Sequence, residues 1–499
     1  MSMLWPILRS ALRARRCTAV VDDQRTYSYA QLAGGACFVA EKIDTLTANP
    51  NVGILLPTSG AFPMILLGAW LAGRVAVPLN YLLKPEELAY VIADSGVDTI
   101  ITAAPMIEFL GGRDAIPQKI KLIQLDRVDF TGIPPLRWPP HANAEDLAVI
   151  LYTSGTSGRP KGVMLTHGNL LAEVRAGITH ADITHADVFL GVLPQFHCFG
   201  LSVLTLIPLF VGAKVVYSAR FVPRKIVQLI REHQPEIVMG VPSMYGALLS
   251  VKQASCEDFQ SIRMAISGGE PLSDDVYQQV LDRFHVQLLE GYGLTETSPA
   301  TNWCTPARFR RHSVGPALPG VEVVIVDDHD HRLPTDTKGE ILIAGPIVMK
   351  GYYHLPQRTA EAITTLDTPH GPTRFFRTGD IGRIDEDGFL YITGRKKEMM
   401  IIAGENVFPR ELEELLCKHP AVHAAAVVGK RDPMRGEIPI AFVEINDGAT
   451  FDEKELRTWC RGQLAAYKIP KEVRQVEKLP RNPTGKVLRK ELAKRIAGE

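Results

Sequence analysis

The sequence has few of the features that mark specialised classes of protein. Its 499 residues include seven cysteines, an odd number with no CxxC pair, which is more typical of reduced cytoplasmic thiols than of a disulfide framework. Lysine and arginine together number 55, as do aspartate and glutamate, so no overall charge favours nucleic acid or an anionic membrane as a partner. We therefore expect a cytoplasmic protein that does not bind nucleic acid.

Long uninterrupted hydrophobic segments are also missing. The most apolar stretch, residues 61–79, is broken by Pro63, Arg74 and Pro78, and it is interpreted as a buried helix followed by a strand rather than a transmembrane segment. The N-terminal stretch MSMLWPILRSALRARR lacks a long apolar core and a clear cleavage site, so we expect no secretory signal. Its basic amphipathic pattern is interpreted as a structural first helix, with contact to lipid as the alternative.

What the sequence does contain is a repeated alternation of strand and helix patterns. The helical pattern KPEELAYVIADSG is followed by the strand-like run VDTIITA, and RKIVQLIREHQP is followed by EIVMGVP. Such strand–helix–strand units predict parallel sheets covered by helices. A chain of this length is too long for one ordinary core, so we expect more than one domain.

The pattern changes after about residue 313. Runs such as KGEILIAG and GFLYITG, separated by turn residues, predict short antiparallel strands, and a compact αβ pattern begins near Arg395. The sequence therefore predicts an α/β fold in two domains. Residues 1–394 form a large domain of stacked, mainly parallel sheets with a β-rich subdomain at about 313–394, and residues 395–499 form a small, mobile α+β lid.

The stretch YTSGTSGRPKG is a candidate phosphate-binding loop. Its glycines let backbone N–H groups turn inward, its hydroxyl side chains add donors, and a lysine adds a cation. The candidate residues are Thr153, Ser154, Gly155, Thr156, Ser157, Gly158 and Lys161. The spacing excludes a Walker A loop, because that motif would need glycine where the chain has Pro160. A solvated Gly/Ser turn is the alternative.

A second candidate site lies in LLEGYGLTETSP. Gly291 and Gly293 allow a flat ring to approach the backbone, and Tyr292 is able to stack on that ring. Thr295 is a candidate donor to a phosphate, and Glu296 supplies the hard oxygen that Mg²⁺ favours. A turn with a surface glutamate is the alternative.

Further candidates lie elsewhere in the chain. In RTGD, Asp380 is placed to accept from two ribose hydroxyls, and Arg395 would donate to the same sugar or phosphate. The stretch SGGEPLS follows a strand and is a candidate wall of a nucleotide or substrate site through Gly269, Glu270 and Pro271.

Three remaining side chains have alternative interpretations. His197 lies among apolar residues and is either a core histidine or a residue that orients or gates a carboxylate substrate. The adjacent Cys198 is interpreted as a buried apolar thiol rather than a nucleophile. Lys486 follows a glycine at a turn and would project from the small domain, whereas the later basic residues are interpreted as a solvated tail.

Together these motifs resemble the adenylate-forming superfamily of acyl-CoA synthetases, luciferases and peptide-synthetase adenylation domains. The stretches YTSGTSGRPKG, GYGLTE, RTGD, GRKKE and PTGK occur in the family's order, and the resemblance covers nearly the whole chain. The resemblance implies that ATP and Mg²⁺ convert a carboxylate to an acyl-adenylate with release of pyrophosphate. A thiol then attacks the adenylate.

The resemblance also implies roles for individual residues. The loop at 153–161 holds the β- and γ-phosphates, Tyr292 stacks on adenine and Thr295 contacts the α-phosphate. Glu296 binds Mg²⁺, and Asp380 holds the ribose.

In the lid, the resemblance gives Arg395 a place near the ribose. Lys486 bridges the substrate carboxylate and the α-phosphate in the first step. Lys397 matches the family hinge, and rotation there would withdraw Lys486. The same rotation would bring Ala403 and Gly404 over the site, where small residues leave room for a pantetheine arm.

The acid and the acceptor are less strongly indicated. The segments that we expect to line the acyl site are 197–200, 240–246, 265–270 and 291–295, and we call them the candidate acyl segments. No acidic residue stands out in them to bind an amino group, and they carry Phe199, Val241 and Met244. An apolar acid is therefore favoured over an amino acid. We expect a medium- or long-chain fatty acid, with Gly293 leaving space for the chain, and an aryl acid is the competitor. CoA is the expected acceptor, and a carrier-protein phosphopantetheine is the alternative. A nucleotide-binding regulatory protein without activity is the alternative from another class.

Overall fold

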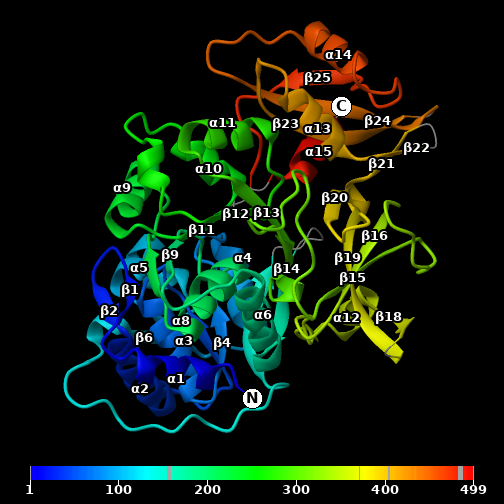
Figure 1. Ribbon diagram of the computed structural model, residues 1–499. Helices are drawn as coiled ribbons and strands as arrows, with labels where there is room; N and C mark the ends of the chain where they lie inside the picture. Colours follow the sequence, from blue (N-terminus) through cyan, green and yellow to red (C-terminus); the bar gives the residue numbers. More distant parts are fainter. Residues whose placement is uncertain are drawn as a thin grey trace. The chain divides into compact units, whose positions relative to one another are not determined.

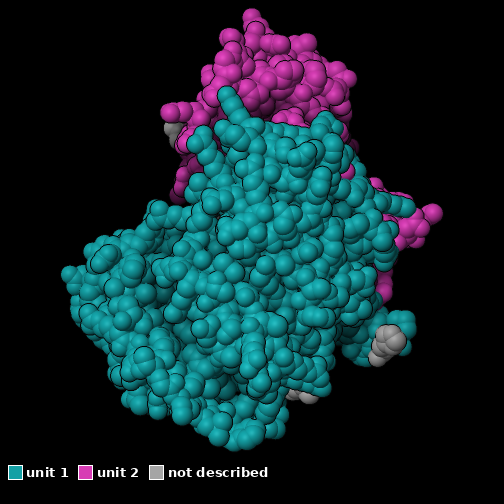
Figure 2. Space-filling view, turned by 60° about the vertical axis from the view of Figure 1, so that its left-hand side comes forward, with its two compact units in different colours: residues 1–269, 280–323, 343–376 teal, residues 270–279, 324–342, 377–499 magenta. Residues whose placement is uncertain are grey.

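Two compact units make up the computed structural model, which describes residues 2–153, 159–369, 371–402, 405–432, 434–481 and 487–497. Figure 2 colours the two units separately. Unit 1 comprises residues 1–269, 280–323 and 343–376, and unit 2 comprises residues 270–279, 324–342 and 377–499. The expected boundary at residue 395 and the expected hinge at Lys397 stay predictions, because contacts inside each unit do not report which residues act as a pivot.

Unit 1 contains an eight-stranded sheet with a parallel centre (Figure 1). Its order is β14-β13-β12-β11-β9-β10-β1-β2; the six central strands run parallel, and β14 and β2 pair antiparallel at the edges. Apolar residues fill the central strands because helices cover a parallel sheet. The strands are β1 (Thr18–Val21), β2 (Thr26–Ser28), β9 (Val188–Gly191), β10 (Lys214–Tyr217), β11 (Ile237–Gly240), β12 (Met264–Gly268), β13 (Leu288–Gly293) and β14 (Ala300–Trp303).

A second sheet of unit 1 has seven strands in the order β17-β8-β7-β4-β3-β5-β6. The strands from β7 to β6 run parallel, whereas β8 pairs antiparallel with both β7 and β17. The strands are β3 (Asn51–Ile54), β4 (Val75–Pro78), β5 (Thr99–Thr102), β6 (Lys121–Gln124), β7 (Leu147–Thr153), β8 (Lys161–Thr166) and β17 (Gly351–Tyr352).

Helix α3 (Ala61–Leu71) confirms the interpretation of the most apolar stretch, because it is buried on every side and is followed by strand β4. No helix among the described residues is both long and apolar enough to cross a bilayer. The other helices of this part of the chain are α1 (Leu4–Arg13), α2 (Tyr29–Leu46), α4 (Pro85–Asp94), α5 (Ala104–Phe109), α6 (His167–His180), α7 (Cys198–Leu201), α8 (Ile207–Val211), α9 (Pro223–His233), α10 (Pro242–Leu248), α11 (Asp274–Phe284) and α12 (Pro356–Ala362).

The β-rich region that the sequence predicts after residue 313 is a five-stranded sheet. Its order is β15-β16-β19-β18, and β20 pairs with β19. Strand β19 pairs antiparallel with β18 and β20, as expected for short strands joined by turns. The strands are β15 (Glu322–Val326), β16 (Gly339–Ala344), β18 (Ile363–Thr368), β19 (Gly371–Ile384) and β20 (Leu390–Arg395).

The C-terminal part of unit 2 has its own sheet and core. Helix α13 (Pro409–Cys417) begins with proline at its first turn and buries Leu412, Leu415 and Leu416. Asp452 caps α14 by accepting from the backbone N–H groups of Lys454 and Glu455. The elements are β21 (Met400–Ile402), β22 (Glu405–Val407), β23 (Val422–Asp432), β24 (Gly436–Ile445), β25 (Glu472–Gln475), α14 (Glu453–Arg461) and α15 (Arg489–Ala497). The predicted fold class is therefore confirmed.

Candidate active site

Strand pairing fixes both ends of the candidate phosphate loop. Thr153 ends β7, Lys161 begins β8, and the two residues are direct partners in the antiparallel register. Helix α6 follows β8 at once, because Thr166 and Asn169 form a reciprocal capping box at its start. The predicted residues between the two strands lie outside the described residues; they are Ser154, Gly155, Thr156, Ser157 and Gly158.

A tyrosine that the motifs did not indicate links the loop lysine to the candidate metal ligand. The Lys161 ammonium lies 4.1 Å from the centre of the Tyr352 ring, and the Tyr352 hydroxyl donates to Glu296 Oε1 at 2.8 Å. Burial and the Glu296 carboxylate raise the pKa of Tyr352, so its hydroxyl keeps the proton that it donates. Pairing of Tyr352 with Val163 in β8 places the ring beside the loop.

The turn that carries Thr295 and Glu296 is held by backbone contacts. It follows β13 as a short 3-10 helix, and the Met349 N–H donates to the Glu296 carbonyl at 2.8 Å. The Cys198 thiol donates to Thr295 Oγ1 at 3.4 Å. Because the threonine oxygen accepts this bond, its own proton is left to donate to a ligand.

Cys198 is a buried thiol, as the sequence predicts. Its side chain is almost fully enclosed, and burial raises the pKa of the Cys198 thiol to about 12. A thiol with this pKa is protonated at neutral pH and is not a nucleophile.

A close backbone contact requires glycine at position 293, and the expected space for an acyl chain there stays a prediction. A Cβ atom there would lie 1.9 Å from the carbonyl oxygen of Pro299, so the close passage of backbone against backbone excludes any side chain. At Gly291 a Cβ atom would lie 3.2 Å from the Trp303 side chain. The residue between these glycines, Tyr292, is partly exposed at the end of β13.

His197 is exposed rather than enclosed in the core. It caps α7 by accepting from the Phe199 N–H at 3.3 Å. The surrounding protein still lowers the pKa of His197. An exposed histidine at a helix start does not fit the core interpretation, and a role in orienting or gating the substrate stays a prediction.

The candidate acyl segments converge at the end of β12. A Cβ atom on Gly268 would lie 3.3 Å from the Phe199 ring, and one on Gly269 would lie 3.7 Å from Val241. Helix α10 follows Val241 and adds Met244, whose sulfur would lie 3.6 Å from a Cβ atom on Gly240. The next two predicted residues along the chain, Glu270 and Pro271, begin a segment of unit 2.

The other side of α10 faces a small apolar cavity. Every side chain that lines it belongs to a hydrophobic residue, and Tyr245 points its hydroxyl away to the carbonyls of Val238 and Ile266. The lining includes Leu248, Phe259, Ala265 and Phe284.

In unit 2, the register of β19 and β20 brings Asp380 and Arg395 together. The two residues are direct partners, and Arg395 Nε lies 3.1 Å from Asp380 Oδ1. Asp380 is buried, and its backbone N–H donates to Thr378 Oγ1 at 2.9 Å. The structure therefore places these two predicted residues side by side.

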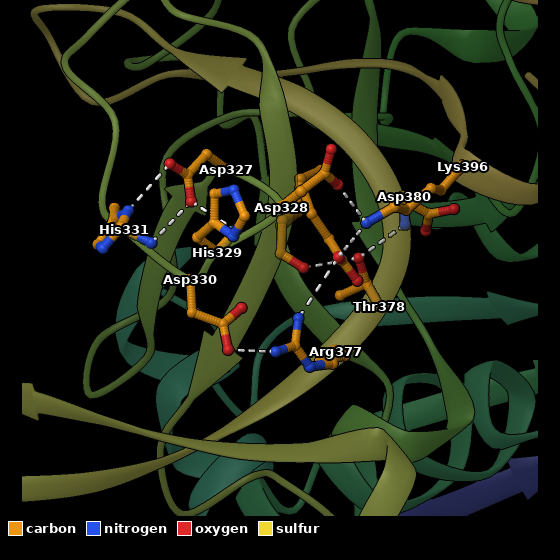
Figure 3. A network of polar contacts seen from close by, with 11 residues as sticks. Asp327, Asp328, His329, Asp330, His331, Arg377, Thr378, Asp380 and Lys396 are labelled. Carbon is orange, nitrogen blue, oxygen red and sulfur yellow. Dashed lines mark hydrogen bonds and ion pairs between the residues drawn. The ribbon is translucent and has the colours of Figure 1, made fainter. Parts of the chain in front are cut away.

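Figure 3 shows a network of ion pairs next to Asp380 that the motifs did not indicate. Lys396 Nζ lies 2.9 Å from Asp328 and 3.1 Å from Glu340. Arg377 pairs with Asp330 and lies 3.5 Å from Glu340. The network anchors Lys396, the residue before the expected hinge, to the turn after β15 through Asp328 and to strand β16 through Glu340. Three further predicted residues, Ala403, Gly404 and Lys486, lie outside the described residues.

The residues present fit a magnesium ion held mainly by a nucleotide. Among the described residues, no group of three or more His, Cys, Asp or Glu side chains forms a metal cage. Glu296 has its carboxylate held by the neutral Tyr352 hydroxyl and forms no ion pair within the described chain. Mg²⁺ typically takes one or two carboxylates together with phosphate and water oxygens, which matches this arrangement.

The chain belongs to the family of AMP-binding enzymes. The AMP-binding enzyme model matches residues 8–353, and the model of the AMP-binding enzyme C-terminal domain matches residues 411–486. A feruloyl-CoA synthase from Amycolatopsis sp is 32% identical over 99% of this chain and 98% of that protein. A long-chain-fatty-acid–CoA ligase from Bacillus subtilis (strain 168) is 32% identical over 90% of this chain and 86% of that protein. ATP-bound MatB from Rhodopseudomonas palustris has a TM-score of 0.87 and 31% identity over 99% of both chains.

These similarities, with the fold, define an AMP-forming acid–thiol ligase. The enzyme uses ATP with Mg²⁺ and passes the activated acyl group to CoA.

Proposed function

We propose that this enzyme activates a medium- or long-chain fatty acid as acyl-AMP and transfers the acyl group to CoA. The proposal rests on Phe199 and Val241 at the end of β12 and Met244 at the end of the neighbouring strand β11, because these apolar side chains favour an apolar acid.

An aryl acid is the second candidate substrate. The similarity to the feruloyl-CoA synthase extends over nearly the full length of both proteins, whereas the fatty-acid ligase is covered over 86% of its length. The Phe199 ring would stack on a flat substrate as readily as it would contact an alkyl chain.

In the first step, the acid carboxylate attacks the α-phosphorus and the bond to pyrophosphate breaks. Lys161 and the Thr153 side chain hold the phosphates, while Thr295 donates its free proton to the α-phosphate. Asp380 accepts from the ribose hydroxyls, with Arg395 fixing its carboxylate. When bound to Glu296, Mg²⁺ reduces the charge repulsion between the carboxylate and the triphosphate.

The remaining residues position the adenine ring and the carboxylic acid, and they leave room for CoA in the second step. Tyr292 stacks on adenine, and Gly291 and Gly293 on either side of Tyr292 let the adenine ring approach the backbone. His197 orients the acid, and Lys486 bridges the carboxylate and the α-phosphate. The CoA thiol then attacks the acyl carbonyl and AMP leaves; Ala403 and Gly404 leave room for its pantetheine arm.

A panel of acids tests the proposal. The enzyme is incubated with ATP, Mg²⁺ and CoA, and with octanoic, dodecanoic, hexadecanoic, ferulic or coumaric acid, and the thioester is measured by mass spectrometry. We expect the highest kcat/KM with dodecanoic or hexadecanoic acid. A higher kcat/KM with ferulic acid would replace the fatty acid with the aryl acid. Pyrophosphate release without an acyl-CoA product, but with capture by a carrier protein, would overturn CoA as the acceptor.

A further inference from the structure

Helix α1 presents two faces of different chemistry. Leu4, Ile7 and Ala11 are buried and pack the helix onto unit 1, which confirms it as a structural helix. On a solvent-facing side of the same helix, Trp5 is 44% exposed and Leu12 is 77% exposed. Large apolar side chains that gather on the exposed side of a helix mark a candidate contact surface.

Arginines surround these exposed apolar residues. Arg9, Arg13, Arg15 and Arg16 are all exposed, and none of them forms an ion pair with any residue that the structure describes. No aspartate or glutamate occurs before Asp22. The whole chain has equal numbers of basic and acidic residues, but its N-terminal helix carries basic residues alone.

A second exposed apolar segment, residues 133–138, lies against α2, one of the helices on which α1 packs. In the extended stretch after β6, Ile133 is 94% exposed, Leu136 is 89% exposed and Trp138 is 79% exposed. The stretch lies along α2, because Pro134 packs on Gly34 and Arg137 pairs with Asp44. Figure 1 shows α1, α2 and this stretch in the same part of the fold.

We propose that the exposed face of α1, with the stretch at 133–138, docks on an anionic lipid bilayer. Arginines attract anionic headgroups, while tryptophan and leucine side chains insert at the boundary between headgroups and acyl chains. The helix lies in the plane of the membrane surface, with its buried face still packed on unit 1. Docking there would bring the enzyme to a surface in which apolar acids concentrate, but the contact itself does not require a fatty acid as substrate.

The charges favour a bilayer over two other occupants. A symmetric contact with a second copy would bring two sets of unpaired arginines together, which opposes association. Nucleic acid would accept the arginines but offers no apolar layer for Leu12, Ile133 and Leu136.

Vesicle co-sedimentation of the full chain tests the proposal. We expect the protein to sediment with phosphatidylcholine vesicles that contain phosphatidylglycerol, and to remain in solution with phosphatidylcholine alone or at high salt. The R9Q/R13Q variant should bind about 25-fold more weakly, since each of the two basic residues near a charged surface strengthens partition about fivefold. L12Q should weaken binding to the same vesicles without changing its salt dependence.

A matched pair of substitutions in another helix controls for lost charge. Lys454 and Arg461 are exposed basic residues on α14, which also carries acidic residues, and K454Q/R461Q should bind like the unchanged protein. Activity on a water-soluble acid without vesicles should be unchanged in all variants, so loss of ligase activity and loss of docking are separate results. Equal loss of binding in the α14 variant, binding to neutral vesicles, or preferential binding to DNA would overturn the proposal. Self-association of the unchanged protein that the R9Q/R13Q variant no longer shows would also overturn the proposal.

Discussion

Two carboxylates, one in each unit, are held in different ways. In unit 1, Glu296 is oriented by the neutral hydroxyl of Tyr352 and has no cationic partner among the described residues. In unit 2, Asp380 is buried against the Arg395 guanidinium. The first arrangement leaves a negative charge for a cation, whereas the second compensates the charge and leaves an acceptor suited to hydroxyl groups.

The largest expected effect on activity comes from Lys486, a residue of unit 2 that lies outside the described residues. Lys486→Ala removes the cation that we propose bridges the carboxylate and the α-phosphate, so acid-dependent pyrophosphate release should fall about 10³-fold. Thioester formation from supplied acyl-AMP and CoA should change little. An equal loss in both half-reactions would contradict the role given to Lys486.

Removing the charge of Glu296 tests the unit 1 side of the comparison. Glu296→Gln keeps an oxygen for the Tyr352 hydroxyl but loses the metal-binding charge, and adenylation should fall about 10²-fold. Calorimetry should show that ATP binding no longer strengthens when Mg²⁺ is added, whereas Tm stays within a few degrees. Unchanged Mg²⁺ dependence of ATP binding would remove Glu296 as the ligand.

The hydroxyl of Tyr352 should have a smaller effect. Tyr352→Phe keeps the ring under Lys161 but loses the bond to Glu296, so the Mg²⁺ concentration needed for half-maximal activity should rise about tenfold. Tyr353→Phe is the matched control, since the Tyr353 hydroxyl accepts from Asn51 and touches neither residue. The same rise in both variants would mean that the effect is structural.

Sequence patterns predicted the elements better than the contacts between them. The alternation of strands and helices and the buried helix α3 follow from local patterns. The bond between Tyr352 and Glu296 joins residues 56 positions apart and depends on the pairing of β17 with β8, which no local motif reports. The ion pairs of Lys396 with Asp328 and Glu340 depend on sheet register in the same way.

The smallest expected effect is a pH dependence of stability in unit 1. Burial lowers the pKa of His167 to about 4, from an ordinary value of 6.5. The folded state therefore favours the neutral ring, so this stability is fully present above pH 6.5 and is lost as the pH falls toward 4. Between pH 7 and pH 5 the free energy of unfolding should fall by roughly 2 kcal/mol from this group.

Denaturant titrations at several pH values measure this dependence. His167→Gln should flatten the fall in unfolding free energy between neutral and mildly acidic pH, and a substitution of the exposed His141 should not. A pH dependence that is the same in the original protein and in His167→Gln would show that His167 is not the group responsible.

Oxygen-18 labelling of the acid tests the central claim most directly. With dodecanoic acid labelled in its carboxylate, ATP, Mg²⁺ and CoA, attack of the carboxylate on the α-phosphorus leaves one labelled oxygen in AMP when the CoA thiol displaces it. We expect AMP with one labelled oxygen for each thioester formed, and unlabelled pyrophosphate. Label in inorganic phosphate, or thioester formed with unlabelled AMP, would contradict it.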